Sequence, residues 1–281
     1  MEKINIEKVV VPSELSEILQ EYKLKPVSIG CSTSKVYFAS SNSPNQENLY
    51  LKILKREADY SLSEERDRLN WLQQLIPLGV GKAIAQVKYF KRSSDYDYLL
   101  LTEIKGTPIC DRSILETLSP RIVIKVLVEG LKAIHSTDIT FCSFDGSLTK
   151  RIEKAAYRKR MGYLNKEYLT KVFKGKNIDS IFGELVADRP NEENLVFTHG
   201  DYCLPNVLIN NKKLQGFIDW GSAGIASPYQ DLSLLVGSLS RNYGKENFEK
   251  FDMLKLVFNL YGFEDIDYEK IKYYQKLEEF L

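Results

Sequence analysis

The segment "THGDYCLPN" (residues 198–206) places a histidine, an aspartate and an asparagine close together. Asp201 could accept or orient the proton of a substrate hydroxyl. Asn206, five residues later, offers an amide oxygen of the kind that Mg²⁺ accepts. Pro205 stiffens the chain between them. We interpret His199 as a residue that hydrogen-bonds nearby backbone and holds the loop, and not as a base. This combination suits phosphoryl transfer, which relies on positioned charges more than on covalent catalysis.

Three further residues fit the same chemistry. Asp219 ends an apolar run in "FIDWG" and is followed at once by a turn, so its carboxylate is well placed to bind Mg²⁺. Lys52 lies inside the apolar strand "LYLKIL", where an ammonium is costly unless it is paired. It could reach the phosphates of a nucleotide, although an outward-facing strand lysine would read the same way. Glu65, near the start of the next helix, could pair with Lys52, and by spacing alone Glu64 is a near-equal candidate.

A turn of small residues, "GCSTS" (residues 30–34), precedes the lysine strand. Such a turn lets backbone N–H groups approach phosphates closely. The segment is not a Walker A loop, because G-x-x-x-x-G-K-[ST] is absent. Alone it is equally typical of an ordinary hairpin. Taken in order, however, the loop, the lysine, the glutamate, H-G-D-x-x-x-x-N and D-x-G together indicate a phosphotransferase.

The elements that must position these residues change character along the chain. Before residue 105 the pattern predicts a mainly antiparallel sheet with helices at 13–22 and 61–76. "KGTPI" (residues 105–109) has the breakers of a linker. From about Pro120 the pattern is helical, interrupted by two short strands, "NVLINN" and "LQGFID". The sequence therefore predicts an α+β protein of two lobes: residues 1–104 as a nucleotide-binding lobe, and residues 105–281 as a catalytic and substrate-binding lobe.

Composition excludes several classes of protein. The 281 residues are 43% hydrophobic and 27% charged with a net charge of +1, which is ordinary for a globular protein and indicates no particular partner. The four cysteines form no C-x-x-C pair, so we expect free thiols. No apolar run is long enough for a signal peptide or a membrane span. We expect a cytoplasmic protein, with its oligomeric state open between monomer and dimer.

These motifs resemble the aminoglycoside 3′-phosphotransferases, the kanamycin kinases among the kinase-like antibiotic phosphotransferases. The resemblance covers nearly the whole chain, and its clearest stretches are "GCSTSKVY", "NLYLKI", "LVFTHGDYCLPNVLI", "LQGFIDWGSAGIASPYQDLSLL" and "KIKYYQKLEEFL". It implies a two-lobed, protein-kinase-like fold with a small β-rich N-lobe and a larger helical C-lobe. It also implies antibiotic resistance by transfer of a phosphoryl group from ATP (GTP being possible) to a small-molecule hydroxyl, with Mg²⁺.

The resemblance assigns roles to particular residues. In the nucleotide site, Lys52 would bind the α- and β-phosphates, and its partner would be Glu65 and not Glu64. The remaining nucleotide contacts would come from Gly30 and Ser32 over the phosphates, Tyr50 stacked on adenine, and Thr102 and Ile104 in the hinge 101–104.

The other implied roles belong to the second lobe. Asp201 would be the catalytic aspartate, while Asn206 and Asp219 would hold Mg²⁺. Asp231 would brace the catalytic loop, and His135 would be structural. The acceptor would be bound by the C-terminal carboxylates: Glu278, Glu279 and the terminal carboxylate of Leu281.

The sequence departs from this family where the acceptor should bind. Aminoglycosides are polycations and the family lines their site with acidic residues, yet Ser222 stands where an arginine is usual and the segment 147–176 is strongly basic. Against Glu153 and Glu167, that segment carries Lys150, Arg151, Lys154, Arg158, Lys159, Arg160, Lys166, Lys171, Lys174 and Lys176.

Three hypotheses stay open at this stage. If the basic segment faces away from the cleft, the acceptor is an aminoglycoside. If it faces the cleft, like charges would repel a polycation. The acceptor would then be another hydroxylated metabolite or antibiotic, neutral or anionic, or the protein would be a weak resistance enzyme. The third hypothesis is a nucleotide- or nucleic-acid-binding protein without turnover, and the intact set of candidate residues argues against it.

Overall fold

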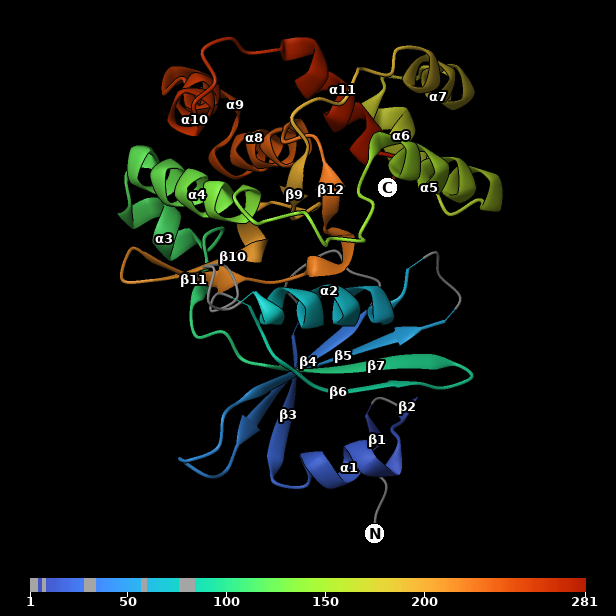
Figure 1. Cartoon of the computed structure of the whole chain (residues 1–281), viewed down its shortest axis with the longest axis vertical. Helices are drawn as coiled ribbons and strands as arrows, with labels where there is room; N and C mark the ends of the chain where they lie inside the picture. The colour runs from blue at the N-terminus through green and yellow to red at the C-terminus, as the bar shows by residue number, and fades with distance from the viewer. Residues whose placement is uncertain (1–4, 7–8, 28–33, 57–59, 76–83) are drawn as a thin grey trace.

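The computed structural model describes residues 5–6, 9–27, 34–56, 60–75 and 84–281 (Figure 1). Gly30 and Ser32, the predicted phosphate-covering residues, lie outside this described part. The first lobe is built on a five-stranded antiparallel sheet in the order β3-β4-β5-β7-β6, which confirms the predicted β-rich lobe. Its strands are β3 (Tyr22–Val27), β4 (Lys35–Ser41), β5 (Leu49–Lys55), β6 (Val87–Arg92) and β7 (Tyr96–Thr102). A short pair, β1 (Asn5–Ile6) and β2 (Val9–Val10), precedes them.

The central strand β5 determines where Lys52 points. Because successive side chains of a strand alternate between faces, Tyr50 and Lys52 share one face of the sheet, and Leu51 and Ile53 share the other. Leu51 and Ile53 pack in a core with Leu15 of α1 (Ser13–Leu19). Figure 1 shows α1 on this outer face and α2 on the opposite face, toward the second lobe.

Helix α2 (Leu62–Gln74) joins the two lobes. Ser61 is its N-cap, and its side chain accepts a hydrogen bond from the N–H of Ser63, as expected of a serine in this position. The buried residues Leu69 and Leu72 belong to a core that continues into the second lobe. The helix packs against the short turn η4 (Trp220–Ser222) of that lobe. Part of the first lobe is therefore fixed to the second by a shared apolar core.

The second lobe is mainly helical, as predicted. Its helices are α3 (Arg112–Thr117), α4 (Pro120–His135), α5 (Leu148–Met161), α6 (Lys166–Val172), α7 (Ile178–Ala187), α8 (Tyr229–Tyr243), α9 (Lys245–Lys250), α10 (Met253–Tyr261) and α11 (Tyr268–Glu278). Two small sheets carry the candidate site: β8 (Thr107–Pro108), β10 (Val207–Asn210) and β11 (Lys213–Phe217) in one, β9 (Val196–Thr198) and β12 (Gly224–Ala226) in the other.

The structure corrects the sequence reading in three places. The first helix ends at Leu19 and not at Tyr22, because Tyr22 already pairs with Ser41 in the sheet. The "KGTPI" linker contains β8, which pairs with β10. Strands β9 and β12 were not predicted, since three residues are too few to show a periodic pattern.

Two expectations from composition can be compared with the described part of the chain. Cys110, Cys142 and Cys203 are free thiols there, as predicted. Within those residues no helix is long and apolar enough to span a bilayer.

Candidate active site

His199 holds the backbone of the loop between β9 and η3 (Leu204–Asn206). Its Nε2 lies 3.0 Å from the carbonyl oxygen of Ile218, and its Nδ1 accepts a hydrogen bond of 3.3 Å from the N–H of Asp201. Complete burial lowers the pKa of the imidazole, so the ring is neutral and both of its nitrogens are engaged. The predicted hydrogen bonds of His199 to nearby backbone are present, and the prediction that it is not a base stays a prediction.

Asp231, at the start of α8, holds the same loop through its carboxylate. Its carboxylate accepts hydrogen bonds from the N–H of His199 (2.7 Å) and of Gly200 (2.9 Å), and Nε2 of His135 lies 3.1 Å away. Gly200 has φ of +81°, and a Cβ there would lie 2.0 Å from the carbonyl oxygen of Ser222, so only glycine fits. The predicted bracing by Asp231 and the structural role of His135 are both confirmed.

The loop so held presents Asp201 and Asn206 to each other. The side-chain amide of Asn206 donates to the carbonyl and to Oδ2 of Asp201, both at 2.9 Å. Burial raises the pKa of the Asp201 carboxyl to about 7, helped by the charges of Glu278 and Asp219. A carboxylate with this pKa is a competent proton acceptor near neutral pH. Because the side-chain N–H groups of Asn206 point at Asp201, the Oδ1 of Asn206 remains available to another ligand.

Lys52 contacts one carboxylate in each lobe, Glu65 in the first and Asp219 in the second. Its Nζ lies 2.8 and 2.9 Å from the two oxygens of Glu65 and also contacts Oδ1 of Asp219. Burial would lower the pKa of Lys52, but Asp219 and Glu65 outweigh it and raise the pKa. In turn Lys52 lowers the pKa of Asp219. The lysine is therefore charged, and the structure brings the three predicted residues together.

The geometry also separates Glu65 from Glu64. The side chain of Glu65 is 1% exposed and faces Lys52, whereas that of Glu64 is 53% exposed and lies 3.5 Å from Arg68. Arg68 in turn donates to the carbonyl of Ala223 in the second lobe. Helix α2 thus delivers Glu65 to Lys52 while it is anchored beside Asp219.

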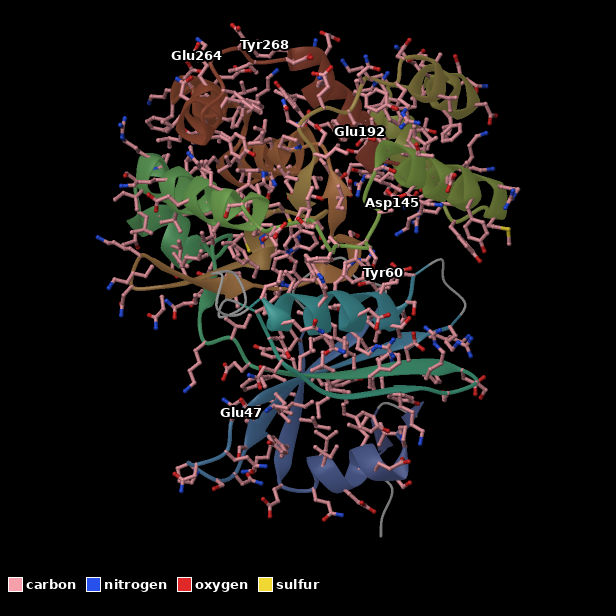
Figure 2. The ribbon with its side chains drawn as sticks, in the orientation of Figure 1. Glu47, Tyr60, Asp145, Glu192, Glu264 and Tyr268 are labelled. Atoms are coloured by element: carbon pink, nitrogen blue, oxygen red, sulfur yellow. The ribbon has the colours of Figure 1, made fainter. Side chains whose placement is uncertain are left out.

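Close packing at the turn after Asp219 fixes the start of α2. Asp219 has φ of +67°, in the left-handed region, and its side chain is 37% exposed. Figure 2 shows Tyr60 between α2 and the second lobe, where a Cβ on Gly221 would lie 2.4 Å from its hydroxyl oxygen. The packing of Tyr60 therefore requires a glycine at position 221.

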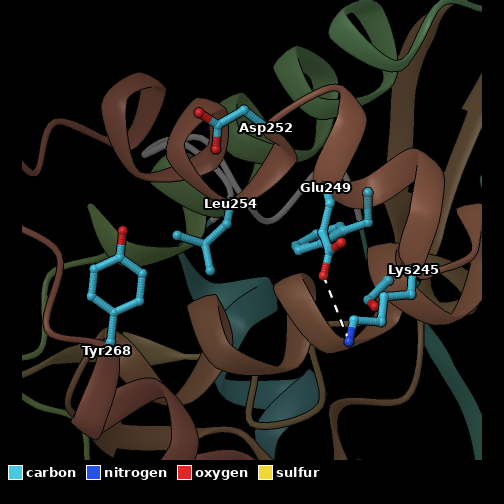
Figure 3. Close-up of a pocket in the computed structure, with 7 residues that line it drawn as sticks. Lys245, Glu249, Asp252, Leu254 and Tyr268 are labelled. Carbon is cyan, nitrogen blue, oxygen red and sulfur yellow. Dashed lines mark ion pairs between the residues drawn. The ribbon is translucent and has the colours of Figure 1, made fainter.

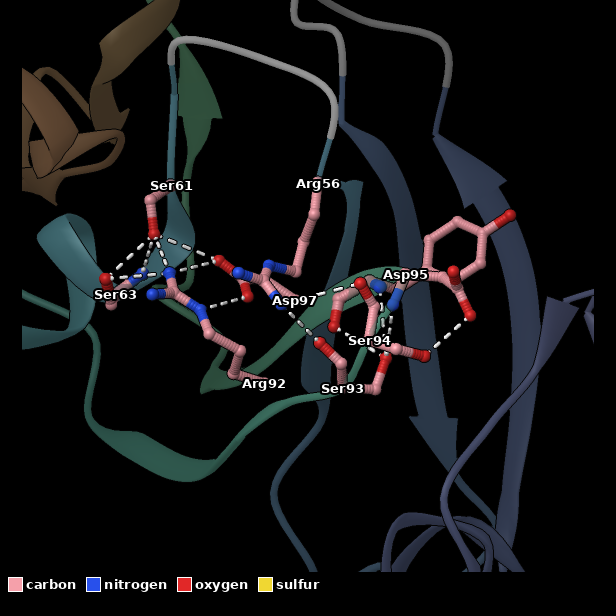
Figure 4. Close-up of polar contacts among 9 residues, drawn as sticks. Arg56, Ser61, Ser63, Arg92, Ser93, Ser94, Asp95 and Asp97 are labelled. Carbon is pink, nitrogen blue, oxygen red and sulfur yellow. Dashed lines mark hydrogen bonds and ion pairs between the residues drawn. The ribbon is translucent and has the colours of Figure 1, made fainter.

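A polar cluster at the far end of the β6–β7 hairpin holds the N-terminus of α2 (Figure 4). The carboxylate of Asp97, 1% exposed, accepts two hydrogen bonds of 2.8 Å from the guanidinium of Arg92 and one of 3.0 Å from the hydroxyl of Ser61. Arg92 also donates to the hydroxyls of Ser61 and Ser63. This cluster, here called the hairpin clamp (Ser61, Ser63, Arg92 and Asp97), ties the helix that carries Glu65 to the sheet that carries Lys52.

The predicted adenine contacts lie at one end of the same sheet, near the start of β5 and the end of β7. Tyr50 is half-buried, shares its face with Lys52 and packs on Phe38, with ring centroids 5.1 Å apart. Thr102 is already tied to Gln86, since its N–H donates to the Gln86 carbonyl and its hydroxyl accepts from the Gln86 N–H. Within the described residues the N–H of Ile104 has no acceptor. Of the two predicted hinge residues, Ile104 is the one with a backbone donor to offer.

The C-terminal residues lie beside the catalytic loop, but their charges are not all free. Glu278 is paired with Arg151 of α5, whose guanidinium also donates to the carbonyl of Gly200 at 3.4 Å. Glu279 and Leu281 are half-buried, on either side of the fully buried Phe280. The ring of Phe280 packs on Phe173 and Phe182, with centroids 5.9 and 5.6 Å away, which fixes the end of the chain.

The basic segment is divided between two sides of α5. Arg151 reaches the catalytic loop, and Nζ of Lys154 lies 5.8 Å above the ring of Tyr60 in the first lobe. Lys159 points elsewhere, toward Asp179 of α7 at 2.6 Å. Neither of the two sequence-based alternatives describes the segment as a whole, because only part of it lies near the candidate site.

Oxygen ligands suited to Mg²⁺ are present where the sequence placed them. Within the described residues no group of three His, Cys, Asp or Glu could form an all-protein metal cage. Mg²⁺ does not need one, since it is commonly held by one or two carboxylates together with substrate phosphates and water. Asp219, partly exposed, and Oδ1 of Asn206 supply hard oxygen donors. The donor set fits the ion.

The fold and this site together define a kinase-like phosphotransferase. The chain belongs to the phosphotransferase enzyme family known as APH, whose family model matches residues 23–271. It is an enzyme that transfers a phosphoryl group to a hydroxyl.

Individual relatives agree over nearly the full length. An aminoglycoside 3′-phosphotransferase of Niallia circulans is 31% identical, over 96% of this chain and 97% of that protein. One from Enterococcus faecalis is 29% identical, over 97% and 98%. The crystal structure of an aminoglycoside 3′-phosphotransferase of type VIII superposes with a TM-score of 0.77 at 26% identity, over 93% and 94% of the two chains. An aminoglycoside phosphotransferase of Streptomyces rimosus in complex with ADP and streptomycin shares the fold, with a TM-score of 0.74 at 20% identity, over 95% and 97%.

Two parts of the site were not found from the sequence. Arg151 was counted only as one cation of a basic run, because nothing local shows that it will meet Glu278. The hairpin clamp was also missed, although the unusual burial of Asp97 could have been suspected from its position between the aromatic and apolar residues of "YDYLLL".

Proposed function

We propose that the protein is an ATP- and Mg²⁺-dependent aminoglycoside 3′-phosphotransferase that confers antibiotic resistance, with residues 1–104 as nucleotide-binding lobe and 105–281 as catalytic lobe. The observation that carries the proposal is the charge cluster at the lobe junction. Lys52, Glu65 and Asp219 lie within direct contact, and Asp201 lies close enough to Asp219 for its pKa to respond. Four aminoglycoside 3′-phosphotransferases are similar to this chain over nearly their full length, which supports an aminoglycoside as the acceptor.

In this proposal each residue has one task. Lys52, held straight by Glu65, binds the α- and β-phosphates, and Tyr50 and Ile104 contact adenine. Asp201 accepts the hydrogen bond of the substrate hydroxyl and takes its proton as the oxygen attacks the γ-phosphorus. Asn206 and Asp219 would hold Mg²⁺, which when bound supplies positive charge to the phosphate oxygens. At the lobe junction, Tyr60 packs against Gly221, two residues after Asp219.

The acceptor end carries both signs of charge. Glu278 is neutralised by Arg151, which leaves Glu279 and the terminal carboxylate of Leu281 as the acidic groups for an aminoglycoside ammonium. The Streptomyces rimosus enzyme, of the same fold, binds ADP and streptomycin, which supports a nucleotide and a cationic acceptor in this architecture. We therefore expect turnover of aminoglycosides with a higher KM than a fully acidic site would give, because the cations Arg151 and Lys154 lie nearby.

A substrate panel tests the acceptor. ADP release would be followed with kanamycin, neomycin, streptomycin, a macrolide and simple polyols, each with ATP and with GTP. Turnover of kanamycin and neomycin but not of their 3′-deoxy analogues supports the proposal. Turnover of only neutral or anionic alcohols would favour the second candidate function, a kinase of another hydroxylated compound, for which the pairing of Arg151 with Glu278 is the specific observation.

A further inference from the structure

Helices α5, α6 and α7 come together at one corner of the second lobe (Figure 1), around a hollow of about 620 Å³. This is within the size range of pockets that hold small molecules. Its walls combine apolar side chains, Leu164, Ile178 and Phe182, with charged ones. The charged lining residues are the cations Lys159, Arg160, Lys166 and Lys176 and the single acid Asp179.

The cations of this hollow, here called the corner pocket, are poorly compensated. Asp179 pairs with Lys159 at 2.6 Å, and the charge of Lys166 also lowers the pKa of the Asp179 carboxyl. Arg160 lies over the ring of Tyr157, 5.6 Å from its centroid, and has no acidic partner in the described part of the chain. Among the same residues, Lys166 and Lys176 likewise have none. One carboxylate therefore serves four cations.

A second hollow shows that such an excess is not a general feature of this surface. The hollow of about 430 Å³ beside α9 and α10 (Figure 3) contains Lys245 and Glu249, whose charged atoms are 3.7 Å apart. Its other acid, Asp252, lies 3.2 Å from Nζ of Lys255. Every charged group of that hollow has an opposite charge at hand, whereas the corner pocket keeps a positive excess.

The corner pocket is separate from the reaction site. Each residue of an α-helix is turned by about 100° from the one before, so Arg160 projects from the side of α5 opposite to Arg151. Arg151 and Lys154 reach the catalytic loop and Tyr60, while Ala156, Lys159 and Arg160 line the pocket. An anion in the pocket would not contact Asp201 or the nucleotide residues.

We propose that the corner pocket binds a small organic polyanion, a compound that carries a phosphate or diphosphate group beside an apolar part. A concave site with one sign of charge and walls of low dielectric concentrates the field and attracts the opposite charge. Arg160 offers a planar fork of donors that matches phosphate oxygens, and Lys166 and Lys176 supply point charges. Phe182 and Ile178 provide the surface for an apolar part. This activity is additional to phosphoryl transfer and does not depend on it.

Binding of inorganic pyrophosphate, measured by calorimetry in buffer with EDTA, tests this proposal. The reference protein carries Lys52→Met, which removes the phosphate-binding lysine of the reaction site. Lys166→Gln and Lys176→Gln are added together as the test, and Lys171→Gln as the matched control. Lys171 lies on the same helix as Lys166, but it is paired with Glu167 at 3.0 Å and does not line the pocket. Thermal unfolding of all variants checks that the fold is intact.

The expected result is binding to the Lys52→Met protein that weakens by about tenfold or more in the double pocket variant and stays within about twofold in the Lys171→Gln control. Absence of binding to the Lys52→Met protein would overturn the proposal. An equal loss in the Lys171→Gln control would also overturn it, because the attraction would then be that of the whole basic surface. Tighter binding of a single-stranded RNA, lost in the same double variant, would replace the small polyanion by a nucleic acid.

Discussion

Two carboxylates beside the catalytic loop, Asp231 and Asp219, are used in opposite ways. Asp231 is 0% exposed, and its two oxygens face three nitrogens of the same lobe, on His135, His199 and Gly200. Asp219 is partly exposed, and within the described part of the chain its side chain is paired with Lys52 of the other lobe alone. Both oxygens of Asp231 are engaged by hydrogen bonds within its own lobe, whereas Asp219 keeps one oxygen for a ligand.

Charge balance sharpens the contrast. Lys52 is in contact with both Glu65 and Asp219, and the charge of Asp219 also acts on Asp201, so the lobe junction has more negative than positive charge. Such an excess is costly in a buried place unless a cation arrives with the substrate. We conclude that a buried charge whose hydrogen bonds are complete marks the scaffold, and one left incomplete marks the reaction site.

Removing the scaffold carboxylate should have the largest effect. Asp231→Ala leaves the N–H groups of His199 and Gly200 buried without an acceptor, so we expect a loss of about 3–5 kcal/mol in the free energy of unfolding. Urea denaturation measures it. A loss below about 1 kcal/mol would show that the loop is held by other contacts and would remove this half of the comparison.

The matching change at the reaction site should affect activity and not stability. Asp219→Asn keeps the shape of the side chain but removes the charge for a metal, so turnover should fall by about a hundredfold or more. The free energy of unfolding should change by less than about 1 kcal/mol, because the side chain is partly solvated. Steady-state kinetics and urea denaturation of one preparation give both numbers. If Asp219→Asn destabilised the protein as much as Asp231→Ala, the distinction between the two carboxylates would be wrong.

The raised pKa of Asp201 predicts a pH dependence of stability for the metal-free protein. Its folded pKa of about 7 lies above the value for an unfolded aspartate, so the folded state binds the proton more tightly. The resulting stabilisation is complete at acidic pH and is lost as the pH rises through about 7. Compared with Asp201→Asn, the wild-type protein in EDTA should therefore lose stability between pH 5 and pH 8 in denaturant titrations. Parallel pH profiles of the two proteins would mean that the carboxyl is not perturbed.

The hairpin clamp should have the smallest effect. Asp97→Asn weakens the hold of Arg92 on the start of α2, so Glu65 aligns Lys52 less well, and we expect KM for ATP to rise by about threefold to tenfold with kcat changed less. Lys91→Gln is the control, since Lys91 is on the same strand and pairs with the exposed Glu14. An equal change in kcat and KM, or the same change in the control, would indicate a general loss of sheet stability.

The two-lobed fold class was predicted from the sequence, and the structure brings together the candidate residues that phosphoryl transfer explains, whose roles stay predictions. Those residues are Lys52, Asp201, Asn206 and Asp219. Asp231 and His135 entered only through resemblance, because the sequence does not show that they meet.

What could not be predicted depends on contacts between distant segments. The pairing of Arg151 with Glu278 joins residues 127 positions apart, and both belong to ordinary amphipathic helices. Strands β9 and β12 are too short for a periodic signal, and they form because each pairs with the other. The division of the basic segment between two sides of α5 likewise follows from packing, which composition does not contain.

The most direct test of the account is the replacement of Asp201 by asparagine. This change keeps the size of the side chain and removes its ability to accept a proton, so ATP affinity, measured by calorimetry with Mg²⁺, should stay within about threefold while kcat falls by about a hundredfold to ten-thousandfold. That result would show that the loop between β9 and η3 performs the transfer of the phosphoryl group. Turnover close to that of the wild type with a folded Asp201→Asn protein would contradict the proposed mechanism.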